Sequence, residues 1–167
     1  MVGQSVLSGP AQNYKVSSLA EAKSNLAKGQ MQNAFNFFSL ELAKATSKIF
    51  SKNIAKLTTK DLAISILNSP DADFSLIRLG IGKETLLDGL KEYPGEQKVS
   101  EIILQAFDVA VAEGHSTVEV GDVLVSLSRS DTFFKEVLSQ LKLEVKDIAN
   151  VVYWQTAVKK ELRQNKH

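Results

Sequence analysis

The sequence has a single internal histidine, His115, in the stretch GHSTVEVGDVLVSL (residues 114–127). An imidazole titrates near neutral pH, so it could act as a general base or a metal ligand. Zinc normally takes three or four His, Cys or carboxylate ligands, but this chain has no cysteine and its only other histidine is the last residue, His167. The ligand count therefore favours a structural histidine near a helix end, and we predict no metal site.

A second stretch, LGIGKETL (residues 79–86), looks like the end of a phosphate-binding loop. That motif needs a glycine five positions before the Gly-Lys pair and a hydroxyl directly after it. Ile77 and Glu84 occupy these two positions, and the charge of Glu84 would face the phosphates. We therefore expect Gly80 to end one helix and Gly82 to begin the next, and we predict no cofactor.

Other groups with catalytic potential are not arranged as a reaction centre. No serine lies in a Gly-x-Ser-x-Gly elbow, and no base accompanies a serine at a recognisable spacing. The carboxylates of Asp71, Asp73, Glu84 and Asp88 fall at predicted helix starts and exposed faces, where they complement the helix dipole. We predict no catalytic residue and expect that the protein is not an enzyme.

Aromatic side chains suggest one candidate binding site. Five phenylalanines are predicted to be core, because buried aromatics at helical spacing are common; these are Phe37, Phe38, Phe107, Phe133 and Phe134. Tyr153 and Trp154 instead end the last apolar segment, just before the polar stretch QTAVKKELRQNKH. A partly exposed pair there could anchor a peptide or a neighbouring domain. The alternative is that both residues pack against the other half of the chain.

Composition narrows the class of partner. Twenty basic and nineteen acidic side chains leave a net charge of +1, so no field attracts nucleic acid or anionic lipid. The absence of cysteine excludes disulfides and thiol nucleophiles and suits a reducing compartment. No apolar run approaches the roughly 18 residues of a membrane span. We expect a cytoplasmic protein, or one of an organelle stroma or matrix, that binds neither nucleic acid nor membrane.

The elements that would position these residues are all helical. Residues 1–16 are expected to be a disordered leader, and residues 17–32 a short helix that starts with a Ser18–Glu21 capping box. From Met31 to Lys52 apolar side chains recur every three to four residues, which predicts a helix with one buried face. Hydroxyl caps in TTKD, followed by the segments DFSLIRLG and KETLLDGLKEY, predict three more helices.

The second half of the chain repeats the first. An offset of 61 positions places Leu42 over Ile103, Ala45 over Ala106, Leu57 over Val118, Asp61 over Asp122, Leu62 over Val123, Ser65 over Ser126 and Ser69 over Ser130. With one inserted residue, Leu76 meets Leu138, Leu79 meets Leu141, Leu86 meets Ile148 and Leu90 meets Val152. Both apolar positions and helix caps agree, which indicates an internal repeat.

The repeat predicts an all-α, pseudo-twofold duplicated four-helix unit of about eight helices, with an extra N-terminal helix. Its copies are residues 33–94 and 95–154, and residues 155–167 form a polar tail or linker that is expected to be helical or frayed. Gly114 and His115 fall over Asn53 and Ile54, and both Gly and Asn enter left-handed backbone conformations easily. A backbone corner is therefore expected in both halves, whereas the imidazole is present in one.

These patterns resemble the Clp N-terminal repeat of Clp-type AAA+ unfoldases. In that family an amphipathic helix ends in Gly-His, a connector carries a buried Val or Ile, and an apolar helix follows. The matching residues are Gly114, His115, Val118, Asp122, Val123, Leu124, Val125 and Leu127. The segment KLTTKDLAISIL keeps the connector and the second helix in the first copy but lacks Gly-His, while LIRLGIGKETLLDGL and VLSQLKLEVKDIANVV fit the later helices. The resemblance covers residues 33–154 approximately.

The resemblance implies a domain that sits on an ATPase ring and receives adaptor proteins or unfolded substrates for a Clp protease particle. Some members bind phosphorylated arginine through a carboxylate at the positions of Lys60 and Gly121, so that ligand is not expected here. Two alternatives stay open: a free-standing accessory protein of a Clp protease complex, and a helical small-ligand binder or enzyme with a cavity that the sequence does not reveal.

Overall fold

The computed structural model describes residues 19, 21–24 and 31–165. Within these residues all regular structure is helical, and extended pairing is limited to one isolated parallel bridge between Phe38 and Val118. The predicted all-α fold class is therefore confirmed. The predicted leader, residues 1–16, lies outside the described residues.

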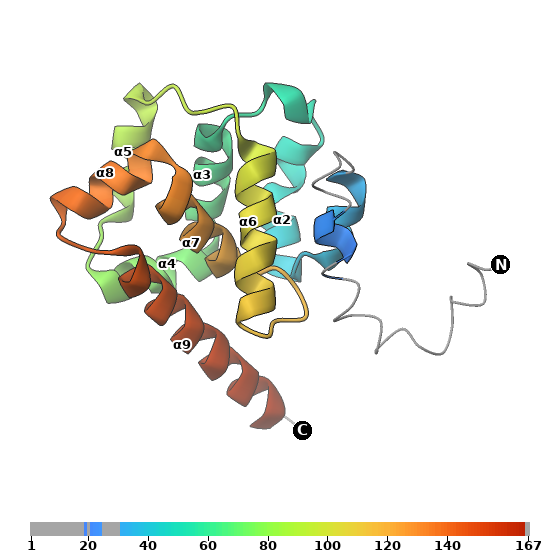
Figure 1. Ribbon diagram of the computed structural model, residues 1–167. Coiled ribbons are helices and arrows are strands. Elements are labelled where there is room, and N and C mark those ends of the chain that lie inside the picture. The colour runs from blue at the N-terminus through green and yellow to red at the C-terminus, as the bar shows by residue number, and fades with distance from the viewer. Residues whose placement is uncertain (1–18, 20, 25–30, 166–167) are drawn as a thin grey trace.

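The helices follow one another with short connections (Figure 1). They are η2 (Met31–Phe37), α2 (Leu40–Phe50), η3 (Ile54–Lys56), α3 (Thr59–Leu67), α4 (Pro70–Leu79), α5 (Lys83–Glu92), α6 (Val99–Ala112), α7 (Val120–Ser130), α8 (Thr132–Gln140) and α9 (Val145–Asn165), where η marks a 3-10 helix. Residues 19 and 21–24 of the predicted N-terminal helix are also helical. Leu19 is buried, and Lys23 forms an ion pair with Asp108 of α6.

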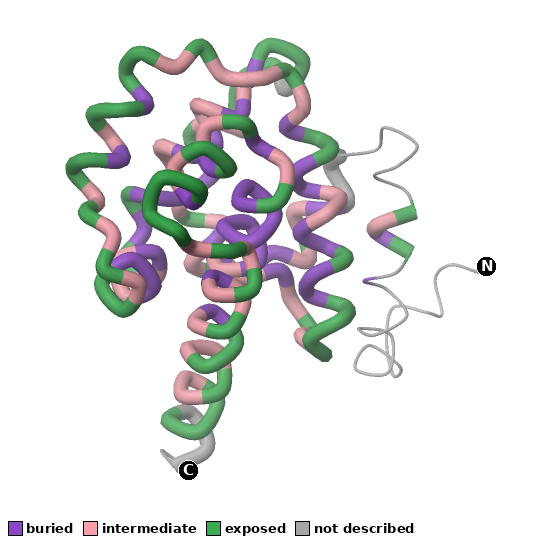
Figure 2. Tube along the Cα trace, turned by 60° about the vertical axis from the view of Figure 1, so that its left-hand side comes forward, coloured by how far each residue is buried: buried purple, intermediate pink, exposed green. Residues whose placement is uncertain are grey.

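Helix α7 is the centre of the fold. It packs against α3, α4, α6, α8 and α9, and most of its residues are buried. Figure 2 shows that the buried positions gather on the inner helices, while the far half of α9 alternates between exposed and intermediate positions. Three of the five phenylalanines predicted to be core are buried and the other two are partly buried against them, namely Phe38, Phe107 and Phe134, then Phe37 and Phe133.

The helix predicted from Met31 to Lys52 is interrupted, and in this respect the prediction is wrong. Residues Met31–Phe37 form a 3-10 helix, and Ser39 starts α2 by accepting a hydrogen bond from the Leu42 amide on its Oγ (3.1 Å). Between the two helices, the amide of Val118 donates to Phe37 O and the amide of Ser39 donates to Val118 O. The apolar period continues across the break, so periodicity could not locate it.

The helix boundaries in the first half largely follow the predicted caps. Thr58 and Asp61 form a capping box at the start of α3. Helix α4 begins at Pro70, three residues before the segment predicted, because proline is favoured in the first helical turn. Gly80 closes α4 with a left-handed φ of 73°, and Gly82 is the N-cap of α5.

Three pairs of helix starts in the two halves have nearly the same offset. Helices α3 and α7 begin 61 positions apart, at Thr59 and Val120. Helices α4 and α8, and likewise α5 and α9, begin 62 positions apart. Both offsets are those that align the sequence with itself, whereas helices α2 and α6 begin 59 positions apart, at Leu40 and Val99.

Helix α9 extends through residues 155–165, the segment predicted to be a tail, and projects from the body of the molecule (Figure 1). Neither glycine nor proline occurs after Gly121, so no residue type in the segment breaks a helix. Gln155 and Lys159 also fasten it to α4, through contacts described below. Within the described ranges, none of the helices combines the length and apolar content that crossing a bilayer requires.

Candidate functional site

The Gly114–His115 pair forms the backbone corner that ends α6. Gly114 has a φ of 75°, which is strained for residues with a side chain. The His115 amide donates to Ala110 O (2.9 Å), closing the last turn of the helix. The predicted corner is confirmed here. The left-handed conformation predicted for Asn53 is wrong, because Lys142 is the one residue other than glycine with a positive φ in the described chain. Asn53 instead uses its side-chain oxygen to accept from the Ala55 amide.

The corner places His115 against a buried carboxylate. His115 Nδ1 lies 3.0 Å from Asp122 Oδ2, and the same oxygen accepts from the Glu119 amide (2.8 Å) at the start of α7. Asp122 is fully buried, and its second oxygen has no hydrogen-bond partner among the described residues. The carboxylate can only accept, so Nδ1 carries the proton in this contact. Asp122 therefore fixes both the tautomer and the orientation of the ring.

The hydrogen bond from His115 to Asp122 raises the pKa of the imidazole above its ordinary value. Burial opposes this shift, while the nearby charges of Asp122, Glu119 and Glu113 support it. The charged imidazolium is thus more populated near neutral pH than it is for a free histidine. In that state Nε2 is a hydrogen-bond donor.

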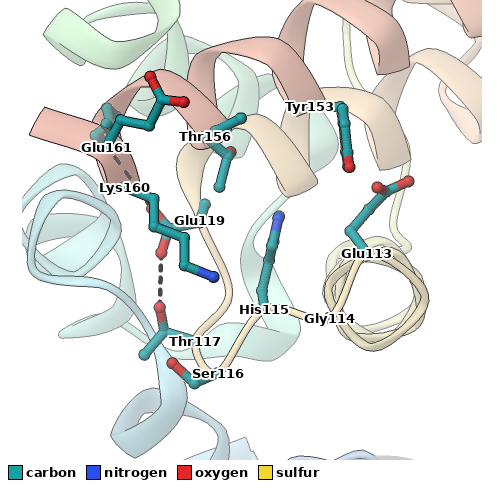
Figure 3. Close-up of a pocket in the computed structure, with 12 residues that line it drawn as sticks. Glu113, Gly114, His115, Ser116, Thr117, Glu119, Tyr153, Thr156, Lys160 and Glu161 are labelled. Carbon is teal, nitrogen blue, oxygen red and sulfur yellow. Dashed lines mark hydrogen bonds and ion pairs between the residues drawn. The ribbon is translucent and has the colours of Figure 1, made fainter. Parts of the chain in front are cut away.

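A cleft of about 480 Å³ lies between this corner and helix α9 (Figure 3). The corner contributes His115 and the hydroxyls of Ser116 and Thr117, and α9 contributes Tyr153 and Thr156. Figure 3 shows the His115 ring extending into the cleft toward Tyr153 and Thr156. The remaining lining is Glu113, Gly114, Glu119, Ala157, Lys159, Lys160 and Glu161. The volume of the cleft falls within the range of small-ligand pockets.

Polar contacts to α4 hold the α9 wall in place. Lys159 Nζ lies 2.8 Å from Asp71 Oδ2 on α4, 3.7 Å from Glu41 Oε1 on α2 and 4.0 Å from Glu119 Oε1 in the cleft lining. Gln155 donates to Asp71 O (3.1 Å) and accepts from the Ser75 hydroxyl (2.9 Å). These contacts position the part of α9 that forms the cleft.

Tyr153 and Trp154, the candidate anchors, face different surroundings. Tyr153 is 56% exposed and lines the cleft. Trp154 is 45% exposed and stacks on Phe74 of α4 at a centroid distance of 5.5 Å, with the Arg78 guanidinium 4.7 Å from its ring centre. Trp154 thus packs against the first half of the chain and also retains an open edge. The two residues are neighbours in sequence but do not form one surface.

Other motifs lie apart from the cleft. Lys83 of the LGIGKETL stretch pairs with Asp73 (3.2 Å). No group of three His, Asp or Glu side chains gathers tightly enough to hold a metal ion within the described part of the chain. The sequence did not point to the α9 residues of the cleft, Thr156, Lys159, Lys160 and Glu161. The signal that could have found them is the uninterrupted helical composition after Val145.

Comparisons with known proteins give no relative: no family model, no curated protein and no solved structure matches the chain.

Proposed function

We propose that the protein is a noncovalent recognition domain of the Clp N-terminal type, which receives adaptor proteins or unfolded substrate segments for an ATP-dependent Clp protease. The sequence resemblance leads to this proposal, and the common helix order of the two halves supports it. The partners would be the ATPase ring and the protease particle, and the compartment would be the cytoplasm, or the stroma or matrix of an organelle.

The observation that carries the proposal is that the fixed helix α9 exposes two aromatic side chains on separate surfaces, one in the cleft and one against α4. Tyr153 and Trp154 keep 56% and 45% of their surface exposed. Stacking with Phe74 and Arg78 restrains Trp154, so little side-chain entropy would be lost when a partner covers it. Aromatic residues held in this way are typical centres of binding energy in protein interfaces.

Direct binding assays with purified components test this function. The ligands are an intact Clp protease particle and a reduced, carboxymethylated protein that stays unfolded. We expect the chain to bind at least one of them and the Tyr153→Ala and Trp154→Ala variants to lose about tenfold in affinity, the size of a typical anchor. Leu141→Ala is the matched control, because Leu141 is 47% exposed and lies outside the cleft.

Thermal unfolding of each variant would show whether a loss of affinity reflects a loss of the fold. Trp154→Phe is the conservative variant, because it keeps an aromatic ring against Phe74. Binding of both ligands with unchanged affinity by the two alanine variants would remove the aromatic pair from the proposal. The absence of binding to either ligand by the unmodified chain would reject the proposed function.

The free-standing accessory protein remains an alternative within the same class. The reading frame around this sequence distinguishes the two, since an adjoining ATPase module would place the domain in an unfoldase.

A second candidate function, a small-ligand binder or enzyme, is favoured by the cleft itself. His115 is oriented by a buried carboxylate, and Ser116, Thr117 and Thr156 bring hydroxyls to the same space. A histidine held in this way by Asp is a common part of hydrolytic sites. Incubation with panels of ester and phosphoester substrates tests this candidate: turnover that His115→Gln abolishes would favour it over recognition.

A further inference from the structure

The cleft between the Gly114 corner and α9 has an excess of carboxylates in and directly behind its lining. Its cations are His115, Lys159 and Lys160. Two of these are paired with acids: His115 with Asp122, and Lys159 with Asp71, Glu41 and, at 4.0 Å, Glu119 of the lining. The lining then keeps the carboxylates of Glu113 and Glu161 beside the single ammonium of Lys160. Among the described residues this balance favours a ligand with positive charge.

One end of the cleft can hold a cation in two ways. Glu113 is exposed there, and Figure 3 shows its carboxylate and the Tyr153 hydroxyl pointing toward one another. The exposed Tyr153 ring offers a face to a cation, and the carboxylate offers a charged acceptor. A guanidinium suits this combination particularly well, because it stacks on aromatic faces and binds carboxylates with two donors.

The middle of the cleft provides donors instead. The His115 side chain is only 9% exposed, and its Nδ1 is occupied by Asp122, so Nε2 is the atom it offers to the cleft, and it donates there in the charged imidazolium. The described residues supply no hydrogen-bond partner for Nε2. Figure 3 also shows the Lys160 ammonium directed toward this region. Donors beside an acidic end match a peptide segment, in which backbone carbonyl oxygens lie next to a side chain.

We propose that this cleft binds an extended protein segment through an arginine or lysine side chain at Glu113 and Tyr153, with a backbone carbonyl accepting from His115 Nε2. This inference rests on the proposed recognition function and names the class of segment recognised. The cleft volume of about 480 Å³ admits a few residues of extended chain and no folded domain.

Fluorescence anisotropy with three labelled peptides tests the inference. The peptides share one eight-residue flexible sequence and differ at a single position, which is Arg, Gln or Glu. We expect the Arg peptide to bind about threefold to tenfold more tightly than the Gln peptide, and the Glu peptide to bind most weakly. The preference should shrink as salt is raised, since the groups involved are exposed.

Variants of the protein assign the preference to the cleft. Glu113→Gln should weaken the Arg peptide about twofold to fivefold, the size of an exposed ion pair, and leave the Gln peptide unchanged. Glu113→Lys should weaken the Arg peptide further and strengthen the Glu peptide, which is a reversal that a structural role would not produce. Glu136→Gln is the matched control, because Glu136 is exposed on α8 and outside the cleft.

The His115 imidazole reports on the second contact without any substitution. Its Nε2 resonance in ¹H–¹⁵N spectra should move when the Arg peptide binds. It should stay in place when sodium chloride alone is added to equal ionic strength. A resonance that ignores the peptide would overturn the carbonyl contact.

The outcomes separate this inference from the function on which it rests. Equal affinity for the three peptides, together with binding of the unfolded protein, would overturn the basic-segment preference and leave recognition standing. If the Arg preference persists unchanged in Glu113→Gln and Glu113→Lys, the cleft is not the site. If neither peptides nor unfolded protein bind, both proposals fall.

Discussion

Asp61 and Asp122 cap the starts of α3 and α7 in the same way, yet only the second helix start adjoins the cleft. Asp61 Oδ2 accepts from the Thr58 amide (2.9 Å), and Asp122 Oδ2 accepts from the Glu119 amide (2.8 Å). The second acceptor contact differs: the Thr58 hydroxyl approaches Asp61, whereas His115 approaches Asp122. In the second half, the carboxylate that caps the helix start therefore also orients an imidazole.

The last helix of each half explains the rest of the difference. Helices α5 and α9 start 62 positions apart, so Thr156 on the cleft wall corresponds to Pro94. The sequence Pro94-Gly95 stops α5, and Glu96 then accepts from the Thr59 amide (2.9 Å). In the first half the chain turns back onto the helix start, while in the second half α9 continues and forms a wall. The cleft arises where the two halves differ.

The largest effect is expected when the buried carboxylate is removed. Asp122→Ala leaves the Glu119 amide and His115 Nδ1 without their acceptor in a buried place, which should cost about 2–4 kcal/mol of unfolding free energy. Asp61→Ala removes a partly exposed capping residue and should cost about 1 kcal/mol. Urea denaturation of both variants measures the two values.

Asp122→Asn is the control for this comparison, since it keeps the shape and an oxygen that can accept both hydrogen bonds but lacks the charge. It should fall between the unmodified protein and Asp122→Ala. Similar losses for Asp122→Ala and Asp61→Ala would mean that the burial of Asp122 and its contact with His115 contribute little.

Local chemistry made much of the fold predictable from sequence. Local sequence identifies the capping box of Thr58 and Asp61 and the helix end at Gly80, and the structure has both. The break at Ser39 escaped prediction because its cause is the pairing of Phe38 with Val118, eighty positions away in the chain. Hydrophobic spacing alone contains no information about such a contact.

The candidate site was less predictable, for the same reason. His115 could be singled out by type, but its partner Asp122 was recognisable only as a helix-start residue. The cleft wall depends on Gln155 and Lys159 meeting Asp71 from a distant helix. These are polar positions in a segment that looks like a tail, so their role follows from tertiary contacts and not from composition.

A smaller effect is expected at the residue that lets α9 approach α7. A Cβ at Gly121 would lie 2.4 Å from Val152 Cγ1 and 3.2 Å from Val152 Cβ, so rotation of the valine cannot relieve the clash. Gly121→Ala should cost about 1–2 kcal/mol, after the helix-forming advantage of alanine is counted. Lys60 occupies the matching position in the first half and is partly exposed, so Lys60→Ala should change stability by less than about 0.5 kcal/mol.

A double-mutant cycle distinguishes this clash from a general loss of packing. Val152→Ala alone opens a cavity, but combined with Gly121→Ala it should destabilise by less than the sum of the two single changes. Additive losses would show that the close approach of α9 to Gly121 is not the constraint. Denaturant midpoints with a constant slope suffice for the cycle.

The smallest effect concerns pH and distinguishes the two helix starts, because Asp122 has an imidazole beside it and Asp61 does not. The pKa of His115 is raised in the folded chain by Asp122, with Glu119 and Glu113 as the other acids that face it. A group with a raised folded pKa contributes stability that is fully present below its unfolded value of about 6.5 and is lost as pH rises through the folded value. Asp122 keeps its hydrogen bond to Nδ1 in both states, so only the charge contribution is lost.

Urea denaturation across this window should show the decline, and His115→Gln should remove it. A rise in stability over the same range would mean that burial of the ring outweighs its carboxylate partner, and an NMR titration of His115 would then show a lowered pKa.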